Sequence, residues 1–308
     1  MYENKADLSL SLCRLCPRQC GIDRTSGQIG YCKSGVKPLV SSVCIHRGEE
    51  PAISGEKGIC NVFFAHCNLQ CIFCQNHQIS RNDNTITQYE YDTDKLAQEI
   101  ITVIENNKTD MLGFVSPAHF SLQMVEVIKK LHNQGYKPTV VYNTNGYETP
   151  DVLEYIAEYV DVYLPDFKYS DNALSSRFSD VSDYVEKTFN ALKIMYRQKG
   201  AKLKIDENGL ARSGIIIRHL VLPGHVENSK GLLRLIADID PNIHISLMSQ
   251  YYPPFQLPIA ELNRHLFEYE YEEVINEMEK LGMENGWIQE LESSENYRPD
   301  FDCEHPFE

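Results

Sequence analysis

Long apolar runs are absent from this sequence of 308 residues. No stretch approaches the roughly 18 consecutive apolar residues that are needed to cross a bilayer. The opening residues, MYENKADLSLSLC, also lack the basic and apolar blocks of a secretory signal peptide. We therefore expect a cytoplasmic protein that has no membrane partner.

An excess of positive charge is also absent. The chain has 29 Lys and Arg against 44 Asp and Glu, which gives a net charge of -15. Binding to a phosphate backbone needs a basic surface, so this balance argues against a nucleic acid as the main partner. Hydrophobic residues make up 42% of the chain, which is enough for one large α/β domain with a small appendage.

Three of the ten cysteines lie in one tight loop, FAHCNLQCIFCQN, as Cys67, Cys71 and Cys74. Thiolates at this spacing suit a 4Fe-4S cluster, because each sulfur can reach a different corner of the cube. Three sulfurs leave one iron without a protein ligand, and an open coordination position is where chemistry takes place. The alternative is a zinc site of three cysteines, in which His66 or His77 supplies the fourth ligand.

A second cysteine group lies near the start of the chain, in CRLCPRQC and in the following GYC. Its members are Cys13, Cys16, Cys20 and Cys32. Four thiolates with no open position fit either structural zinc or an auxiliary 4Fe-4S cluster, and the alternative is four unliganded cysteines. We assign no chemistry to the isolated pair Cys44 and Cys60, or to Cys303 and His305 near the end of the chain.

From residue 61 onward, short β-branched and aromatic runs alternate with amphipathic helices, as in a parallel sheet covered by helices. The predicted strands are 61–65, 111–117, 138–144, 160–167, 214–223 and 242–251. Helical spacing of Leu96, Ile100 and Ile104 exemplifies the helices, and a closing helix is expected over 259–281. Six such units predict an α/β fold, a partial (β/α)6 TIM-like barrel.

Three segments follow from this pattern. Residues 1–55 form a cysteine-rich segment, 56–282 form the barrel, and 283–308 form an acidic tail that packs over one barrel end. The pair Asn208 and Gly209 predicts a hairpin before the fifth strand.

Polar residues stand where the predicted strands end. In such barrels the loops at the carboxyl ends of the strands build the active site. The third strand ends in Asn143, the fourth in Asp166 and Lys168, the fifth carries Arg218, and the sixth ends in Gln250. The turn HRGEEP, with His46, Glu49 and Glu50, either faces this opening or is a solvated loop.

The cysteine loop, with Phe73 before its third cysteine, resembles the signature of the radical S-adenosylmethionine (radical SAM) superfamily. In that superfamily the amino and carboxylate groups of S-adenosylmethionine (AdoMet) chelate the open iron. An electron from the cluster then breaks a sulfonium carbon-sulfur bond, which produces methionine and a 5'-deoxyadenosyl radical.

Other stretches narrow the resemblance. CQN, YNTNGYE, YLPDFKY and RHLVLPG are similar to the activating enzymes of glycyl radical enzymes. CRLCPRQCG, HRGEEP and MSQYYP resemble the pyruvate formate-lyase activating enzyme-like proteins of the PflX type, and this similarity covers nearly the whole chain.

The resemblance implies roles for single residues. Cys67, Cys71 and Cys74 would bind the catalytic cluster, while Asp166 and Lys168 would meet the carboxylate or ribose of AdoMet. Arg218 would neutralise the AdoMet carboxylate, unless it forms an ion pair with Asp166 inside the barrel.

The chain also departs from the related activases at several positions. Asn143 stands where they have an aspartate that helps to hold a cation, and Gln250 and Tyr251 stand where they have a histidine after the sixth strand. The second strand ends in VSPAH instead of a glycine-and-glutamate motif, so Ser116, His119 or backbone carbonyls would hold the AdoMet amino group. His119 could equally cap the next helix from the core.

The expected function is reductive cleavage of AdoMet at a 4Fe-4S cluster, followed by hydrogen abstraction. A glycyl radical enzyme is one candidate partner, and a flavodoxin or ferredoxin would be the electron donor. Radical modification of a small molecule or a peptide is the alternative within the same class. A structural or electron-transfer metal protein is the alternative from another class.

Overall fold

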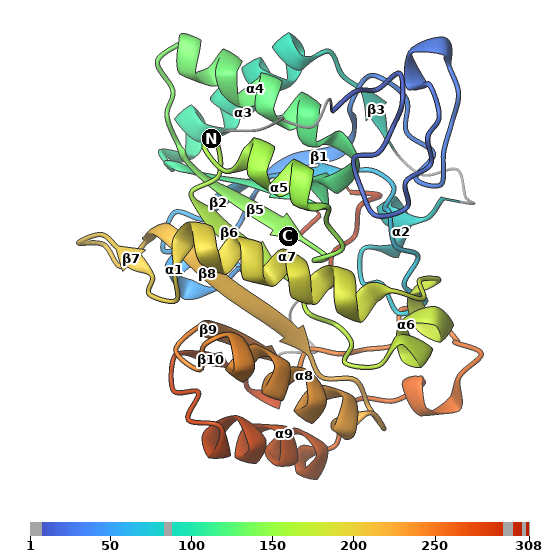
Figure 1. Cartoon of the computed structure of the whole chain (residues 1–308). Coiled ribbons are helices and arrows are strands. Elements are labelled where there is room, and N and C mark those ends of the chain that lie inside the picture. Colours follow the sequence, from blue (N-terminus) through green and yellow to red (C-terminus); the bar gives the residue numbers. More distant parts are fainter. Residues whose placement is uncertain (1–7, 83–87, 292–297, 304–305, 308) are drawn as a thin grey trace, which may run out of the picture.

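The computed structural model describes residues 8–82, 88–291, 298–303 and 306–307. Its centre is a sheet of mostly parallel strands (Figure 1). The six strands that the sequence predicts are all present, as β2 (Ile59–Phe64), β4 (Met111–Val115), β5 (Thr139–Thr144), β6 (Val162–Pro165), β8 (Ala211–Leu220) and β9 (His244–Met248). They lie side by side in chain order and pair in parallel, which confirms the partial TIM-like barrel.

Four further strands were not predicted as such. At one edge, β1 (Leu39–His46) pairs antiparallel with β2, and β3 (Tyr89–Glu90) pairs with β1. At the other edge, β10 (Gly286–Ile288) pairs in parallel with β9, so part of the expected acidic tail belongs to the sheet. The short β7 (Lys204–Ile205) pairs antiparallel with β8 and forms the hairpin expected around Asn208.

Helices cover the outside of the sheet (Figure 1). They include α3 (Thr93–Asn107), α4 (Ser121–Asn133), α5 (Pro150–Ile156), α6 (Asn172–Ser179), α7 (Tyr184–Lys199), α8 (Val226–Ile239) and α9 (Glu268–Lys280). The short α1 (Pro51–Ser54) instead packs inside the barrel, α2 (His77–Ser80) follows the cysteine loop, and 3-10 turns lie at Arg24–Ser26, Pro117–Phe120 and Ala260–Leu262. The predicted closing helix over 259–281 is too long, because α9 begins only at Glu268.

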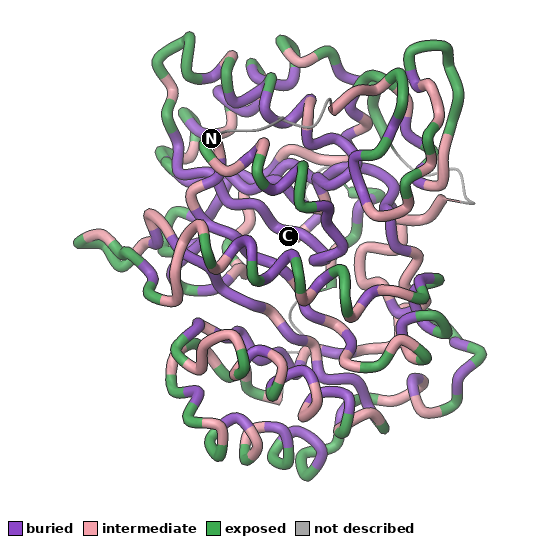
Figure 2. The backbone as a smooth tube through the Cα atoms, viewed as in Figure 1, coloured by how far each residue is buried: buried purple, intermediate pink, exposed green. Residues whose placement is uncertain are grey.

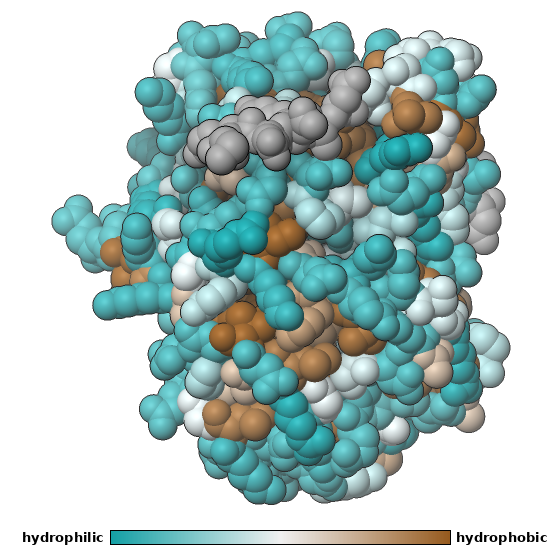
Figure 3. Space-filling model, viewed as in Figure 1, coloured by the Kyte–Doolittle hydropathy of each residue, from teal (hydrophilic) through white to brown (hydrophobic). Residues whose placement is uncertain are grey.

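Each long helix has one buried face and one solvated face. Leu96, Ile100 and Ile104 of α3 are buried, as their spacing predicts. Figure 2 shows the strands in the buried interior and exposed positions along the outer sides of the helices. The face of the molecule in Figure 3 is accordingly mostly hydrophilic. Within the described ranges, no helix has both the length and the hydropathy of a membrane span.

The period of two along each strand divides the core into an outer and an inner part. Val140 and Tyr142 of β5 pack in the large outer cluster beneath the helices, whereas Val141 between them belongs to a small cluster inside the barrel. Ile216 of β8 and Leu164 of β6 belong to the same inner cluster. The residues two positions further along the chain, Asn143, Asp166 and Arg218, therefore also point into the barrel, nearer to the carboxyl ends of the strands.

Candidate active site

The cysteine loop follows β2 directly and lies at the carboxyl end of the parallel strands. Two backbone bonds hold it in place: the amide of His66 donates to the carbonyl of Ile79 at 2.7 Å, and the amide of Ile72 donates to the carbonyl of Phe178 at 2.8 Å. The ring of Phe73 is buried, with ring centroids 6.4 Å from Phe178 and 6.3 Å from Tyr251. The aromatic residue of the motif thus anchors the loop to the barrel.

Each thiol of the loop accepts a hydrogen bond from a neutral side chain. Asn145 Nδ2 donates to Cys67 Sγ at 3.3 Å. Ser179 Oγ donates to Cys71 Sγ at 2.9 Å, and Ser80 Oγ donates to Cys74 Sγ at 3.2 Å. These donors come from three different segments, and donors to sulfur favour the thiolate form that binds metal.

Burial and the mutual proximity of the thiols act on the cysteine pKa values. Burial raises the pKa of Cys67 to about 12, and the Cys71 thiol also raises it, while the bonds from the Leu69 amide and Asn145 act to lower it. The pKa of Cys71 is raised by burial, and the Lys168 ammonium opposes this rise. Buried thiols without metal are therefore protonated, and a cationic centre would displace their protons.

A cavity of about 650 Å³ opens beside the three cysteines. Its lining includes all five residues predicted at the strand ends, namely Asn143, Asp166, Lys168, Arg218 and Gln250. Ligand pockets of roughly 300–1,000 Å³ are typical of small-molecule and cofactor sites. The barrel therefore brings the cysteine loop and the strand ends to one ligand-sized cavity.

A row of ion pairs runs along the wall of this cavity. Lys168 Nζ lies 2.6 Å from Asp166 Oδ2, and Arg218 Nε lies 2.9 Å from Asp166 Oδ1. Arg218 Nη1 also lies 3.2 Å from Glu49 Oε2, and Arg218 Nη2 donates to Asn143 Oδ1 at 2.7 Å. Arg218 thus forms the ion pair with Asp166 that the sequence left open, and Glu49 adds a second carboxylate.

The charges of this row stabilise one another. Burial acts to raise the pKa of Asp166, but the Arg218 guanidinium and the Lys168 ammonium hold that pKa below its usual value. Burial acts to lower the pKa of Lys168, but Asp166 and the Cys71 thiol together raise it above its usual value. All three groups are therefore charged at neutral pH, and the ion pairs fix them for contact with a charged ligand.

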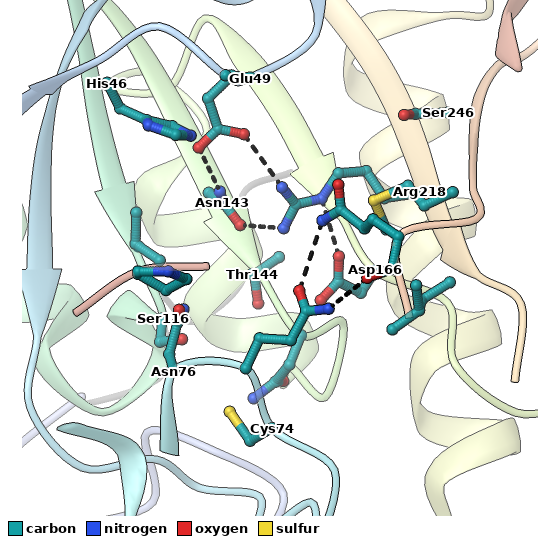
Figure 4. A pocket seen from close by; sticks show the side chains of 18 of the residues that line it. His46, Glu49, Cys74, Asn76, Ser116, Asn143, Thr144, Asp166, Arg218 and Ser246 are labelled. Carbon is teal, nitrogen blue, oxygen red and sulfur yellow. Dashed lines mark hydrogen bonds and ion pairs between the residues drawn. The ribbon is translucent and has the colours of Figure 1, made fainter. Parts of the chain in front are cut away.

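The HRGEEP turn faces the cavity and is not a solvated loop. His46, Glu49 and Glu50 all line the cavity, and Glu49 Oε1 accepts hydrogen bonds from Asn61 Nδ2 at 3.0 Å and Asn143 Nδ2 at 3.4 Å. Figure 4 shows Glu49 pointing toward Arg218 and Asn143, with His46 and Glu49 at the end away from Cys74. Glu49, which orients Arg218, was not assigned this role from sequence.

Of the other residues considered from the sequence, Ser116 and Gln250 reach the cavity and His119 does not. Ser116 lines the cavity, but His119 is fully buried in the core, with Nε2 2.9 Å from the Ala65 carbonyl oxygen. The core-facing position of His119 is therefore confirmed, but the expected cap is wrong, because α4 has no side-chain cap hydrogen bond. Gln250 reaches the cavity, where its side-chain oxygen accepts a bond from Gln289 Nε2 at 2.9 Å.

The four N-terminal cysteines come together in residues 8–38, which we call the N-terminal knob. They line one small cavity, and the thiols of Cys13, Cys20 and Cys32 all act to raise the pKa of Cys16, after the larger effect of burial. The knob contacts the cysteine loop, since Arg18 Nε donates to the Asn68 carbonyl at 3.0 Å.

Neither cysteine group forms a compact single-ion site as it stands. Within residues 8–82, 88–291, 298–303 and 306–307, no three His, Cys, Asp or Glu side chains converge on a position for one metal ion. The loop cysteines instead border the large cavity, and their donor set of three thiols with hydrogen-bond support fits a cluster with one open iron.

Comparison with known proteins decides the family. The model of the radical SAM superfamily matches residues 61–236, which run from β2 into α8 and make up more than half of the chain. The chain belongs to the radical SAM superfamily. Membership implies an enzyme with a 4Fe-4S cluster and bound AdoMet, and the matched segment contains the cysteine loop, Asp166, Lys168 and Arg218.

Individual relatives of this radical SAM protein are distant. An uncharacterized protein of Methanocaldococcus jannaschii is 27% identical over 279 residues, which cover 88% of this chain and 75% of the relative. A domain of pyruvate-formate lyase-activating enzyme from Bacteroides vulgatus is 15% identical with a TM-score of 0.40, over 56% of this chain and 92% of that domain. Streptococcus suis SuiB, solved with its precursor peptide SuiA, is 11% identical with a TM-score of 0.49, over 75% of this chain and 48% of SuiB.

Proposed function

We propose that this radical SAM enzyme cleaves AdoMet reductively and uses the resulting 5'-deoxyadenosyl radical to abstract a hydrogen atom from a substrate. The observation that carries the proposal is the placement of Cys67, Cys71 and Cys74 on one loop, with three supporting donors, beside a charged cavity of about 650 Å³. When bound, the 4Fe-4S cluster would supply an electron and an open iron for the amino and carboxylate groups of AdoMet.

The side chains around the cavity would bind and orient AdoMet. Lys168 presents a compact positive charge near the cysteine loop, which suits the AdoMet carboxylate, and Asp166 can accept bonds from ribose hydroxyls. Arg218 is held by Asp166, Glu49 and Asn143 and retains further N–H groups for the carboxylate. Asn143 and Gln250 offer amides to the remaining polar groups of the cofactor.

The hydrogen donor is either a glycyl radical enzyme, as the resemblance to PflX-type proteins suggests, or a small molecule or peptide. A flavodoxin or ferredoxin would supply the electron. Incubation of the reduced enzyme with deuterated candidate substrates distinguishes the donors, because only the true donor transfers deuterium to 5'-deoxyadenosine.

The N-terminal knob would hold a second metal centre. Four thiols line one small cavity, which is the ligand number of structural zinc or of an auxiliary 4Fe-4S cluster, and a bound metal would draw them closer together. Metal analysis of anaerobically purified protein distinguishes them: zinc gives about one equivalent of zinc, and a second cluster gives roughly eight irons per chain.

Replacement of a cluster ligand tests the proposed reaction. We expect Cys71→Ala to abolish formation of 5'-deoxyadenosine from AdoMet and dithionite, because two sulfurs cannot hold the cluster with one defined open iron. The product is measured by chromatography after anaerobic reconstitution.

Cys303→Ala is the matched control, since this exposed cysteine lies outside the cavity lining. It should form 5'-deoxyadenosine at the wild-type rate. Equal product from the Cys71→Ala variant, or none from the wild-type protein with its cluster intact, would contradict the proposal.

A further inference from the structure

One wall of the cavity is built by three strands whose residues are in register. Arg218 of β8 pairs with Ser246 of β9, and Ser246 pairs with Trp287 of β10. Ile245 and Leu247, on either side of Ser246, pack in the outer core, so Ser246 faces the interior of the barrel. Register neighbours in parallel strands share a face, and all three residues of the register line the cavity.

Glu50 also lines this cavity, and it forms no ion pair with any of the described residues. It is 8% exposed and lines the cavity, and its Oε2 is buried without a hydrogen-bond donor. The other carboxylates of the lining, Glu49 and Asp166, are each paired with Arg218 or Lys168. Among the ion pairs of the described residues, none involves Glu50.

Among the described residues, no cation forms an ion pair with Glu50, and its nearest side-chain donor is the neutral Ser246 hydroxyl. Burial raises the pKa of Glu50, the Arg218 guanidinium acts to lower it, the Glu49 carboxylate raises it further, and hydrogen bonding from Ser246 acts to lower it. Burial likewise lowers the pKa of His46 to about 4, and its Nδ1 is also buried without a partner. Buried polar atoms without a partner are rare in native proteins, and a bound ligand is one way to satisfy them.

The side chains around Glu50 favour a cationic ligand. Trp287 presents an indole, and the Phe307 ring lies 4.0 Å from His46, so aromatic rings and a carboxylate line the same end of the cavity. Cations bind the faces of aromatic rings, best of all tryptophan, and ammonium and guanidinium groups donate hydrogen bonds to carboxylates. An anion would meet the carboxyl groups of Glu49 and Glu50, while the nearby Arg218 guanidinium is already paired with Glu49 and Asp166.

We propose that Glu50, Ser246 and Trp287 form a binding subsite for an ammonium or guanidinium group of the hydrogen-donor substrate. Ser246 lies, like His46 and Glu49, at the end of the cavity away from Cys74 (Figure 4), Glu50 follows Glu49 in the chain, and Trp287 pairs with Ser246. AdoMet would therefore occupy the cysteine end and the substrate the glutamate end. The assignment to the hydrogen donor rests on the proposed function, whereas binding of the cation can be measured by itself.

Trp287 is the only tryptophan of the chain, so its fluorescence reports directly on the subsite. The reconstituted enzyme is saturated with AdoMet and titrated anaerobically with n-butylammonium or methylguanidinium. We expect a saturable change in emission, and binding about tenfold weaker in Glu50→Gln, which keeps the shape but removes the charge. Glu56→Gln, an exposed position two residues beyond α1, should bind as the wild type does.

Calorimetry with Trp287→Phe provides a second variant that does not depend on fluorescence. It should also bind the cations more weakly, because phenylalanine is a poorer cation partner than tryptophan. Thermal unfolding confirms that each variant is folded. Undiminished binding in folded Glu50→Gln, equal binding of butyrate, or competitive displacement of the cations by AdoMet would overturn the subsite.

The same preparations are assayed for 5'-deoxyadenosine with dithionite. A preparation that cleaves AdoMet but binds neither cation refutes the subsite and leaves the proposed function intact. A preparation that binds the cations but forms no 5'-deoxyadenosine refutes the proposed function and its assignment of the cation to a hydrogen donor.

Discussion

At the scale of the residue, single polar side chains reach the cysteine loop from distant parts of the chain. Asn145 both donates to Cys67 Sγ and bonds Asn68 Oδ1 at 2.7 Å, while its own oxygen accepts from the Tyr147 amide at 3.0 Å. Its amide orientation is therefore set by three contacts. A side chain held in this way can support a thiolate without reorganising when metal binds.

Close to Asn145, the carboxyl of Glu148 is fully buried. It accepts a hydrogen bond from Tyr142 Oη at 3.0 Å and another from Thr144 Oγ1, but its Oε2 has no partner. Burial raises the pKa of Glu148 to about 7, although both hydrogen bonds act to lower it. The native protein therefore retains a proton on this group at pH values where the unfolded chain has lost it.

This proton predicts a pH dependence of stability. Below about pH 4.5 the carboxyl is protonated in both the folded and the unfolded state, so its titration does not change the free energy of unfolding. As the pH rises to about 7, the unfolded chain loses this proton first, and the free energy of unfolding should fall by about 3 kcal/mol. Glu148→Gln removes the titration, so its urea-unfolding free energy should fall less between pH 5 and 7. Parallel pH profiles for the two proteins would contradict this account.

At the scale of the element, β10 depends on one glycine. Gly286 has φ +125°, and a Cβ built there would lie 1.9 Å from the carbonyl oxygen of Ile245 on β9. Only glycine allows this conformation together with such a close approach. Because Trp287 is the next residue, the same glycine positions the indole at the cavity.

Gly286→Ala should therefore lower the free energy of unfolding by at least about 2 kcal/mol and shift the emission of Trp287. Urea unfolding followed by tryptophan fluorescence measures both effects. Gly282→Ala is the matched control, since Gly282 also has a positive φ of +70° but has nothing within 4 Å of the added Cβ. Equal losses in the two variants would show that backbone strain alone, and not the contact with β9, limits this position.

At the scale of the whole molecule, the N-terminal knob is attached to the barrel by hydrogen bonds to backbone carbonyls. Arg18 bonds the Asn68 carbonyl, and Arg24 Nη1 donates to the His119 carbonyl at 2.8 Å. The guanidinium of Arg18 also lies 3.7 Å from the centroid of the Tyr31 ring. The knob thus supports the back of the cysteine loop, while its own cysteines line a separate cavity.

This separation predicts that the two cysteine groups can be disabled independently. Cys16→Ser should lose the metal that we propose for the knob and unfold at a lower temperature, yet still form 5'-deoxyadenosine, because Cys16 does not line the large cavity. Metal analysis, thermal unfolding and the product assay measure the three effects. Complete loss of AdoMet cleavage in a folded variant would instead assign the knob an essential part in the reaction.

The sequence by itself determined the class of fold, the family and the cysteine loop. Short runs of β-branched and aromatic residues predict strands that are buried on both faces, and three cysteines within eight residues must lie close together in any fold. The strand-end residues Asn143, Asp166, Lys168 and Arg218 could be predicted for the same reason, since parallel strands bring their carboxyl ends to one edge. Such inferences need only local spacing and one rule of topology.

Only the tertiary structure decided which distant segments meet. Nothing local to HRGEEP shows that Glu49 pairs with Arg218, 169 residues away. Likewise, the short β10 has too little pattern to identify it as a strand, so Trp287 could not be placed beside Ser246. These contacts form because β1 and β10 add to the two edges of the parallel sheet. The energy of burying a side chain depends on the partners it meets there, and the spacing of residues along the chain does not specify those partners.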